Sequence, residues 1–442
     1  MSAGRSIVPA TSRRRLLGTA AAAVAVGAVG CGRTGAADRT EVSLWFSYGG
    51  NNRRVLLDLI DRFHHVQSSV RVVPTFQGDY FEGLAKLRTA LFAGATPTLS
   101  HVVGEVVPYL YEAGALERLD EIGEDALADL VPSLAQQGTF VDGANLPTVA
   151  LPFNRSTPIA YYNRTLFRDL RLEPPRTWDD LRRVARAATR RGAGGSAKNV
   201  ERWGFECPVD WWFWVALVGQ AGGELIRPSD GAVLLGGEAG AQAIELWQQM
   251  VHEDRSMKPP PGRDYDAWQA TNTDFLAGRA AMIWTSTAFL RYLERNASFE
   301  VGAAPLPGNR RRSVPTGGTF FIMPRGRAAS RTDLRRQRAA ATFLRWMMAP
   351  AQANAWAMRT GYMPVSRSGL AELEQSGYYD DHPNDRVTID QLAHAQPWPW
   401  APTLFRVQRE AVQPRLEEAV LLGRDARKTL AAARASLEEG AR

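Results

Sequence analysis

Three observations predict that this chain folds as a two-lobed α/β protein. Its 442 residues are 45% hydrophobic and 22% charged, which is typical of a globular protein with enough chain for two or three domains. Strand-like and helix-like segments alternate with short connections from residue 41 onward, the order expected of a parallel or mixed sheet. The pattern restarts after a polar stretch near residue 152. In such sheets ligands bind beyond the carboxyl ends of the strands.

The first set of elements begins with strand-like segments at 41–47, 70–76 and 97–103. Between the first two, one helical stripe is apolar, formed by Val55, Leu56, Leu59, Ile60 and Phe63. Asp79 is placed to cap a second helix, which Gly94 ends, and residues 105–116 form a third. This order predicts the first lobe.

The second set follows residue 176. Thr177 stands at a capping position, with Asp180 three residues later, and predicts a helix over 177–191. Four more helices are predicted, at about 239–253, 264–277, 332–348 and 403–439. These elements predict a second α/β lobe.

A polar stretch separates the two sets, "PFNRSTPIAYYN" at 152–163. Four polar residues precede a β-favouring, aromatic run, which is unusual for a simple buried strand. A segment that crosses between lobes would offer Ser156 and Thr157 to a ligand while its strand anchors the second lobe.

The N-terminus carries an export signal. Twin arginines in "SRRRLLG" (12–18) precede the apolar run 19–30, which is too short to span a bilayer, where about 20 residues are needed. The run ends in "AVGC" (28–31), a lipobox-like sequence with Ala28 where Leu is usual. We expect residues 1–30 to be a twin-arginine signal peptide, Cys31 to be lipidated, and 31–40 to be a flexible tether.

The cysteine count argues against a disulfide-stabilised fold, and the charge pattern argues against a nucleic-acid-binding protein. Cys207 is the one cysteine besides Cys31, so no disulfide is expected and Cys207 is interpreted as a small packing residue. The formal charge is +7, but only four basic residues are Lys and no basic-aromatic motif appears. No nucleic-acid partner is therefore expected.

Motifs of catalysis are missing from the sequence. It contains no G-x-S-x-G, no G-x-x-x-x-G-K-[ST] and no H-E-x-x-H, so we expect no enzyme activity, cofactor or metal. Two readings of other classes stay open. A hydrolase of glycerophosphodiesters or glycosides would turn over its ligand, whereas a surface adhesin would lack a closing cleft.

Four segments carry a family resemblance: "PFNRSTPIAYYNRTLF" (152–167), "GRAAMIWTSTAFL" (278–290), "PTGGTFF" (315–321) and "TGYMPVSRSGLAELEQSGYYDDHP" (360–383). From about residue 42 to 435 the chain resembles the family 1 extracellular solute-binding proteins of ABC importers. Within that family it is most similar to the branch that binds glycerol 3-phosphate for ugp-type importers.

The resemblance implies the two-lobe, type II periplasmic-binding-protein fold, with three crossings near 153–156, 303–306 and 360–363. The implied first lobe is 41–154 plus 306–360, and the second is 155–305 plus 361–442. A small-molecule ligand is enclosed between the lobes by hinge closure. The implied protein is a monomer on the outer face of the cytoplasmic membrane that delivers its ligand to ABC permease subunits.

The resemblance also implies the ligand contacts. They are Tyr80 and Glu105 from the first lobe, Ser156 from a crossing, Ser286 and Tyr362 from the second lobe, the backbone of Gly318, Arg409, and the tryptophans Trp211 and Trp212. An Arg fork with neutral hydroxyl and N–H donors suits a phosphate or phosphodiester. Alternatives remain, because Arg409 alone could be a solvated charge, "WWFW" (211–214) could be core, and "GG" (317–318) could be a turn.

Three ligands fit this expectation: glycerophosphocholine, glycerol 3-phosphate and an oligosaccharide. A site with one arginine and several aromatic side chains favours a phosphodiester with a cationic head, because aromatic faces attract cations. We therefore expect glycerophosphocholine or sn-glycerol 3-phosphate as the ligand, with the oligosaccharide as the alternative.

Overall fold

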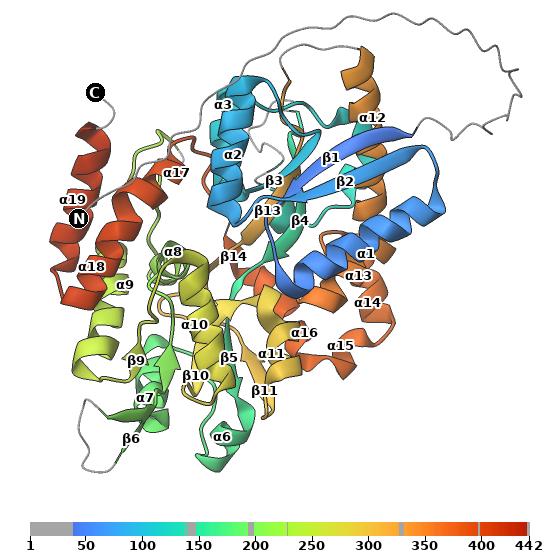
Figure 1. Ribbon diagram of the computed structural model, residues 1–442. Coiled ribbons are helices and arrows are strands. Elements are labelled where there is room, and N and C mark those ends of the chain that lie inside the picture. The colour runs from blue at the N-terminus through green and yellow to red at the C-terminus, as the bar shows by residue number, and fades with distance from the viewer. Residues whose placement is uncertain are drawn as a thin grey trace, which may run out of the picture. The chain divides into compact units, whose positions relative to one another are not determined.

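A computed structural model describes residues 39–136, 138, 147–192, 199–227, 229–326, 331–396 and 398–439 (Figure 1). The expected signal peptide, Cys31 and nearly all of the expected tether lie outside these residues. None of the helices in the described part has the length and apolar character needed to cross a membrane.

The first sheet has the strand order β2-β1-β3-β13-β4. Its strands are β1 (Thr40–Phe46), β2 (Val70–Phe76), β3 (Leu99–Val103), β13 (Gly317–Ile322) and β4 (Ala150–Ser156). β1 pairs in parallel with β2 and β3, whereas β13 runs antiparallel to β3 and β4. The three strands predicted at the start of the chain are confirmed, and they share one carboxyl edge.

Helices cover both faces of the first sheet. One face packs against α1 (Gly50–Val66), α12 (Arg331–Met348) and α13 (Pro350–Thr360). The other packs against α2 (Tyr80–Ala93) and α3 (Val107–Glu112).

The predicted ends of α2 are confirmed. Asp79 accepts from the backbone N–H of Phe81 and Glu82 in a capping box, and Gly94 ends the helix with φ of 68°. The first residue of α2, Tyr80, is thereby held at the carboxyl edge of the first sheet.

The second sheet has the order β11-β5-β10-β8-β9. Its strands are β11 (Val301–Ala304), β5 (Pro158–Asn163), β10 (Met282–Ser286), β8 (Phe205–Glu206) and β9 (Met257–Lys258). The structure therefore has the mixed sheets and flanking helices of an α/β fold built on two separate sheets.

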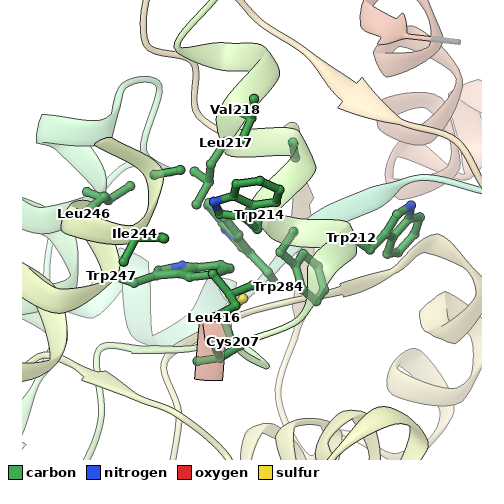
Figure 2. Packing of buried hydrophobic residues seen from close by; sticks show 14 of the residues in the cluster. Cys207, Trp212, Trp214, Leu217, Val218, Ile244, Leu246, Trp247, Trp284 and Leu416 are labelled. Carbon is green, nitrogen blue, oxygen red and sulfur yellow. The ribbon is translucent and has the colours of Figure 1, made fainter. Parts of the chain in front are cut away.

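Helices also flank the second sheet. They are α6 (Arg164–Asp169), α7 (Trp178–Ala188), α8 (Trp211–Gln220), α9 (Glu238–Gln248), the π-helical η3 (Gln249–Glu253), α10 (Asp264–Leu276) and α11 (Leu290–Asn296). Thr177 caps α7 as predicted, accepting from the N–H of Asp180. Cys207 is fully buried in the apolar cluster under α8 and α9, as a packing residue would be (Figure 2).

The shorter elements connect these layers. They are the helices η1 (Gly104–Val106), η2 (Asp120–Ile122), α4 (Glu124–Ala128), α5 (Pro132–Ala135), η4 (Thr287–Phe289), α14 (Arg367–Gln375), α15 (Tyr378–Asp381), α16 (Pro383–Asp390) and η5 (Gln391–His394), and the strands β6 (Arg190–Arg191), β7 (Val200–Arg202), β12 (Val314–Pro315) and β14 (Ala395–Gln396).

The single helix predicted over 403–439 is wrong. The chain instead forms α17 (Leu404–Arg406), the π-helical η6 (Val407–Val412), α18 (Gln413–Leu422) and α19 (Ala426–Glu439). Gly423 adopts φ of 64° and caps α18, which reverses the chain. The apolar period continues across the break, because both helices pack on the same cluster.

The polar stretch is itself strand. Asn154, Arg155 and Ser156 belong to β4 in the first sheet, Thr157 follows, and β5 begins at Pro158 in the second sheet. The side chains of Asn154 to Thr157 are all buried. The chain therefore passes from one sheet to the other within two residues.

The other passages differ in length. The expected crossing at 303–306 falls at the end of β11, but the chain joins the first sheet only at Gly317. Leu306 and Val314, between these points, pack in the apolar cluster of the second sheet. Near the expected crossing at 360–363, the N–H of Met363 donates to the carbonyl oxygen of Arg155 at 2.9 Å, so this segment lies beside β4.

Candidate functional site

Two predicted residues follow parallel strands of the first sheet. Tyr80 opens α2, just after β2, and Glu105 lies in η1, directly after β3. Because β2 and β3 both run parallel to β1, these residues meet at the carboxyl edge of the sheet, where ligands of such sheets bind.

Asn154 joins Tyr80 to Tyr362. Its side-chain amide donates to the hydroxyl of Tyr80 at 3.2 Å and to that of Tyr362 at 3.3 Å. The two hydroxyl oxygens lie 3.4 Å apart. The amide oxygen of Asn154 accepts from the N–H of Thr319 at 2.7 Å. The buried Asn154 therefore fixes two tyrosines that are distant in sequence.

The neighbouring Arg155 is a fully buried cation. It donates from Nη1 to the carbonyl oxygen of Gly318 at 3.0 Å and from Nη2 to Oγ1 of Thr316 at 2.8 Å. Its guanidinium carbon lies 4.4 Å from the centre of the Phe320 ring. Burial lowers the pKa of Arg155 to about 10, and the nearby Glu105 opposes that shift, but at neutral pH the group stays charged.

Glu105 supplies the opposite charge. Burial raises the pKa of its carboxyl to about 7; the charge of Arg155 opposes this shift and that of Asp210 adds to it. Near neutral pH Glu105 therefore exists in both protonation states, and Arg155 and Glu105 form an electrostatically coupled pair.

The two glycines of "TGGT" (316–319) are required because β13 passes close to residues of other elements. Gly318 has φ of 89°, and a Cβ there would lie 1.7 Å from the carbonyl oxygen of Asn154. A Cβ on Gly317 would lie 2.4 Å from the ring of Trp212. The glycines therefore let β13 approach both Asn154 and Trp212, which replaces the alternative that they form a turn.

The paired tryptophans take different roles. Trp212 donates from its indole N–H to the carbonyl oxygen of Thr316 at 3.2 Å. Trp211 is fully buried and packs against the rings of Trp214 and Trp398, with ring centres 5.6 and 6.1 Å apart. Figure 2 shows Trp212 directed away from Trp214, at the edge of the apolar cluster, where its ring packs against Phe213 and Trp268. The structure brings Trp212 to the candidate site and leaves Trp211 in the core.

The two serines stand on either side of the passage between the sheets. Ser156 is the last residue of β4 and pairs with Gly317, whereas Ser286 ends β10 and pairs with Pro158. Oγ of Ser286 accepts from the N–H of Ala288 at 3.2 Å. Both are buried, and each sheet therefore contributes one hydroxyl near Thr157.

A glycine positions Tyr362. Gly361 has φ of 101°, and a Cβ there would lie 2.5 Å from the carbonyl oxygen of Thr287. This close approach to η4 lets the segment turn so that Tyr362 stacks on Trp356 and reaches Asn154.

Arg409 lies on η6, which belongs to neither sheet. Its guanidinium carbon is 4.0 Å from the centre of the Phe81 ring, and Phe81 follows Tyr80 on α2. The structure therefore brings Arg409 to the start of α2.

Asn154 and Arg155 were missed by sequence reasoning, which selected only Ser156 and Thr157 from "FNRSTP". A signal was present: two large polar residues stand inside a strand bounded by Pro152 and Pro158. Trp398, whose indole N–H donates to the carbonyl oxygen of Thr316 at 2.7 Å, was also missed. Its partner oxygen is backbone, which no residue pattern marks.

Two surface hollows lie elsewhere. One is lined by residues that include Asp210, Arg263 and Glu417, and the other by residues that include Thr98 and Arg336. Neither contains any of the nine predicted contact residues, so the candidate site is defined by the convergence of its side chains. Within the described residues, no group of three His, Cys, Asp or Glu could hold a metal ion.

Comparison with known proteins finds similarity to bacterial solute-binding proteins. A family model described as bacterial extracellular solute-binding protein matches residues 58–383. The sn-glycerol-3-phosphate-binding periplasmic protein UgpB of Yersinia pestis is 24% identical over 380 residues, covering 82% of each chain. The protein of the same name from Pectobacterium atrosepticum is 24% identical over 397 residues, covering 86% of this chain and 85% of its own.

Solved structures of two-lobe binding proteins share the fold. UgpB from Mycobacterium tuberculosis, in complex with glycerophosphocholine, is 24% identical and superposes with a TM-score of 0.75 over 90% of this chain and 97% of its own. The GacH receptor of Streptomyces glaucescens, whose structures include a complex with acarbose, is 17% identical with a TM-score of 0.77 over 91% and 98%.

Proposed function

The chain belongs to the bacterial extracellular solute-binding proteins, and on this premise we propose that it captures a glycerol phosphate ester for an ABC importer. The ligand is glycerophosphocholine or sn-glycerol 3-phosphate. The protein binds it between the lobes and delivers it intact to the permease subunits, as a monomer without catalytic activity.

One observation carries the choice of ligand. A fully buried arginine, Arg155, lies in the same site as the hydroxyls of Tyr80 and Tyr362 and the amide of Asn154. Glu105 compensates this buried cation only in part near neutral pH, because burial raises its pKa to about 7, so an anionic ligand would supply further negative charge, and the neutral donors would complete the coordination of a phosphate oxygen. The names of the similar proteins agree with a ligand of this class.

The remaining predicted residues have roles in this proposal. Glu105 accepts hydrogen bonds from glycerol hydroxyls, and Trp212 packs against the ligand's carbons or its cationic head. Arg409 is the second cation, and Ser156, Ser286 and the backbone N–H of Gly318 are neutral donors. Trp211 supports Trp212 from the core.

An oligosaccharide is the second candidate. The observation that favours it is the packing of Trp212 across Gly317, since an aromatic ring beside the site also suits a sugar ring. The likeness in fold to the acarbose-binding receptor permits this reading as well. A neutral sugar, however, carries no negative charge that would compensate the buried cation Arg155.

The proposal places the mature protein on the outer face of the cytoplasmic membrane. It rests on the arginine pair Arg13 and Arg14, the apolar run 19–30 and the lipobox-like "AVGC". A lipid on Cys31 would hold the protein beside its permease.

The test is a thermal-shift panel with glycerophosphocholine, sn-glycerol 3-phosphate and maltotriose. A ligand at 100 times its dissociation constant stabilises the fold by about 2.7 kcal/mol. Stabilisation by either phosphate ester supports the proposal, and stabilisation by maltotriose alone moves the sugar alternative ahead. Recovery of unchanged glycerophosphocholine after prolonged incubation separates a binding protein from a hydrolase.

A further inference from the structure

Tyr48 stands at the carboxyl end of a third parallel strand. β1 ends at Phe46, two residues before Tyr48, and β1 runs parallel to β2 and β3. Tyr80 follows β2 and Glu105 follows β3, so all three parallel strands deliver a polar side chain to the same edge. The position of Tyr48 is therefore that of a ligand contact in an open α/β sheet.

The ring of Tyr48 is fixed by its neighbours. It stacks on His101 with ring centres 5.2 Å apart, and it packs against Phe46 and Trp356 at 5.6 Å each. Trp356 in turn stacks on Tyr362. Only 6% of Tyr48 is exposed, so the direction of its hydroxyl is set by packing.

The rings of Tyr48 and Tyr362 both pack on Trp356, with ring centres 5.6 Å apart in each pair. Burial raises the pKa of Tyr48 well above 10, and Tyr80 adds to that shift; Tyr48 in turn adds to the shift of Tyr362. Tyr48 therefore stays neutral and can act only as a hydrogen-bonding hydroxyl.

The buried hydroxyl of Tyr48 makes no hydrogen bond with any described residue. Tyr80 and Tyr362, by contrast, each accept from Asn154. Buried polar groups of native proteins are nearly always hydrogen-bonded, and an exception calls for a partner that the protein chain does not supply. An oxygen of a ligand at this edge would satisfy the hydroxyl.

We propose that Tyr48 is a further ligand-binding residue, whose hydroxyl donates to an oxygen of the bound glycerol phosphate ester beside Tyr80 and Tyr362. This rests on the proposed function. It adds the end of β1 to the elements that form the site. A third tyrosine hydroxyl would then serve the ligand together with those of Tyr80 and Tyr362, which suits an oxygen-rich ligand without adding charge.

Tyr48→Phe tests the proposal, because it removes the hydroxyl and keeps the ring. Calorimetric titration with glycerophosphocholine should show binding about fivefold weaker, the effect of one neutral hydrogen bond. The melting temperature of the ligand-free protein should stay unchanged or rise, since the hydroxyl makes no hydrogen bond in the folded protein that the substitution could remove.

Tyr379→Phe is the matched control. The hydroxyl of Tyr379 on α15 is also buried without a hydrogen-bond partner among the described residues, and it lies outside the candidate site. This variant should bind glycerophosphocholine as wild type does.

Three outcomes overturn the proposal. If Tyr48→Phe binds as tightly as wild type, or if Tyr379→Phe loses as much affinity, the Tyr48 hydroxyl is not a ligand contact, while the proposed function stands. If wild-type protein binds neither glycerophosphocholine nor sn-glycerol 3-phosphate, the proposed function itself fails and the inference fails with it.

Discussion

The guanidinium carbon of Arg409 lies 4.0 Å from the centre of the Phe81 ring. This contact links η6, near the C-terminus, to the first turn of α2, where Tyr80 begins the helix. A cation over an aromatic face is held in place without losing its charge. The contact therefore places a positive charge at the first turn of α2, the helix that Tyr80 begins.

Arg409→Ala should weaken binding of glycerophosphocholine by at least about 2 kcal/mol, near thirtyfold, through the loss of a charge-assisted contact to phosphate. Arg409→Lys should recover only part, because a point charge cannot make the bidentate contact of a guanidinium. Calorimetric titration measures both.

Arg406→Ala is the control for this prediction. Arg406 lies in α17, close to Arg409 in sequence, and its Nε donates to Glu410 at 3.2 Å. Its removal should leave affinity unchanged. Equal affinities of Arg409→Ala and wild type would contradict the role of Arg409 in phosphate binding.

Glu105 should make ligand affinity depend on pH. Its pKa is raised to about 7 by burial, so the carboxyl is mostly neutral at pH 6 and mostly ionised at pH 8. The carboxylate is the better acceptor for glycerol hydroxyls, and affinity for glycerophosphocholine should rise severalfold over this interval.

Glu105→Gln should bind with little change between pH 6 and pH 8. Glu112→Gln, at an exposed position on α3, should keep the wild-type dependence. Calorimetric titrations with glycerophosphocholine at both pH values test this prediction. If the affinity of Glu105→Gln still rises between pH 6 and pH 8, the pH dependence belongs to another group.

Stability should fall as pH rises because of Glu206. This carboxyl is fully buried on β8, and burial raises its pKa from 4.5 to about 8, although Lys258, with Nζ at 3.7 Å, opposes the shift. The folded state keeps a proton that the unfolded chain releases. The free energy of unfolding should therefore decrease between pH 4.5 and pH 8, by at most about 1.4 kcal/mol per pH unit from this group.

Glu206→Gln should flatten that part of the pH profile, as measured by urea unfolding at pH 5 and pH 8. Glu201→Gln, at an exposed position on β7, should not. Parallel profiles for wild type and Glu206→Gln would mean that Glu206 is ionised in the folded protein.

Anchoring should depend on Cys31. Cys31→Ala removes the sulfur that would carry the lipid, and the exported protein should move from the membrane fraction to the soluble fraction. Membrane fractions washed with carbonate provide the measurement. Full retention of Cys31→Ala on the membrane would reject the lipoprotein proposal.

Local chemistry allowed much of the fold to be predicted from the sequence. The strands at 41–47, 70–76 and 97–103 and the caps at Asp79, Gly94 and Thr177 all agree with the structure. These features depend on residues a few positions apart, through side-chain periodicity and capping hydrogen bonds. The C-terminal segment was predicted as a single helix because its apolar residues keep a helical period throughout. Gly423 marks the break, but glycine also occurs inside helices, so its presence did not by itself indicate two helices.

The composition of the site was decided by tertiary structure. Asn154 meets Tyr80 and Tyr362 only because α2, β4 and the segment after α13 converge at one edge. Trp211 and Trp212 are neighbours in sequence, but successive residues of a helix point about 100° apart, so one enters the core and the other faces β13. Tyr48 carried no motif at all. A site of this kind depends on contacts between residues as far apart in sequence as Phe81 and Arg409, and side-chain patterns in a sequence describe only near neighbours.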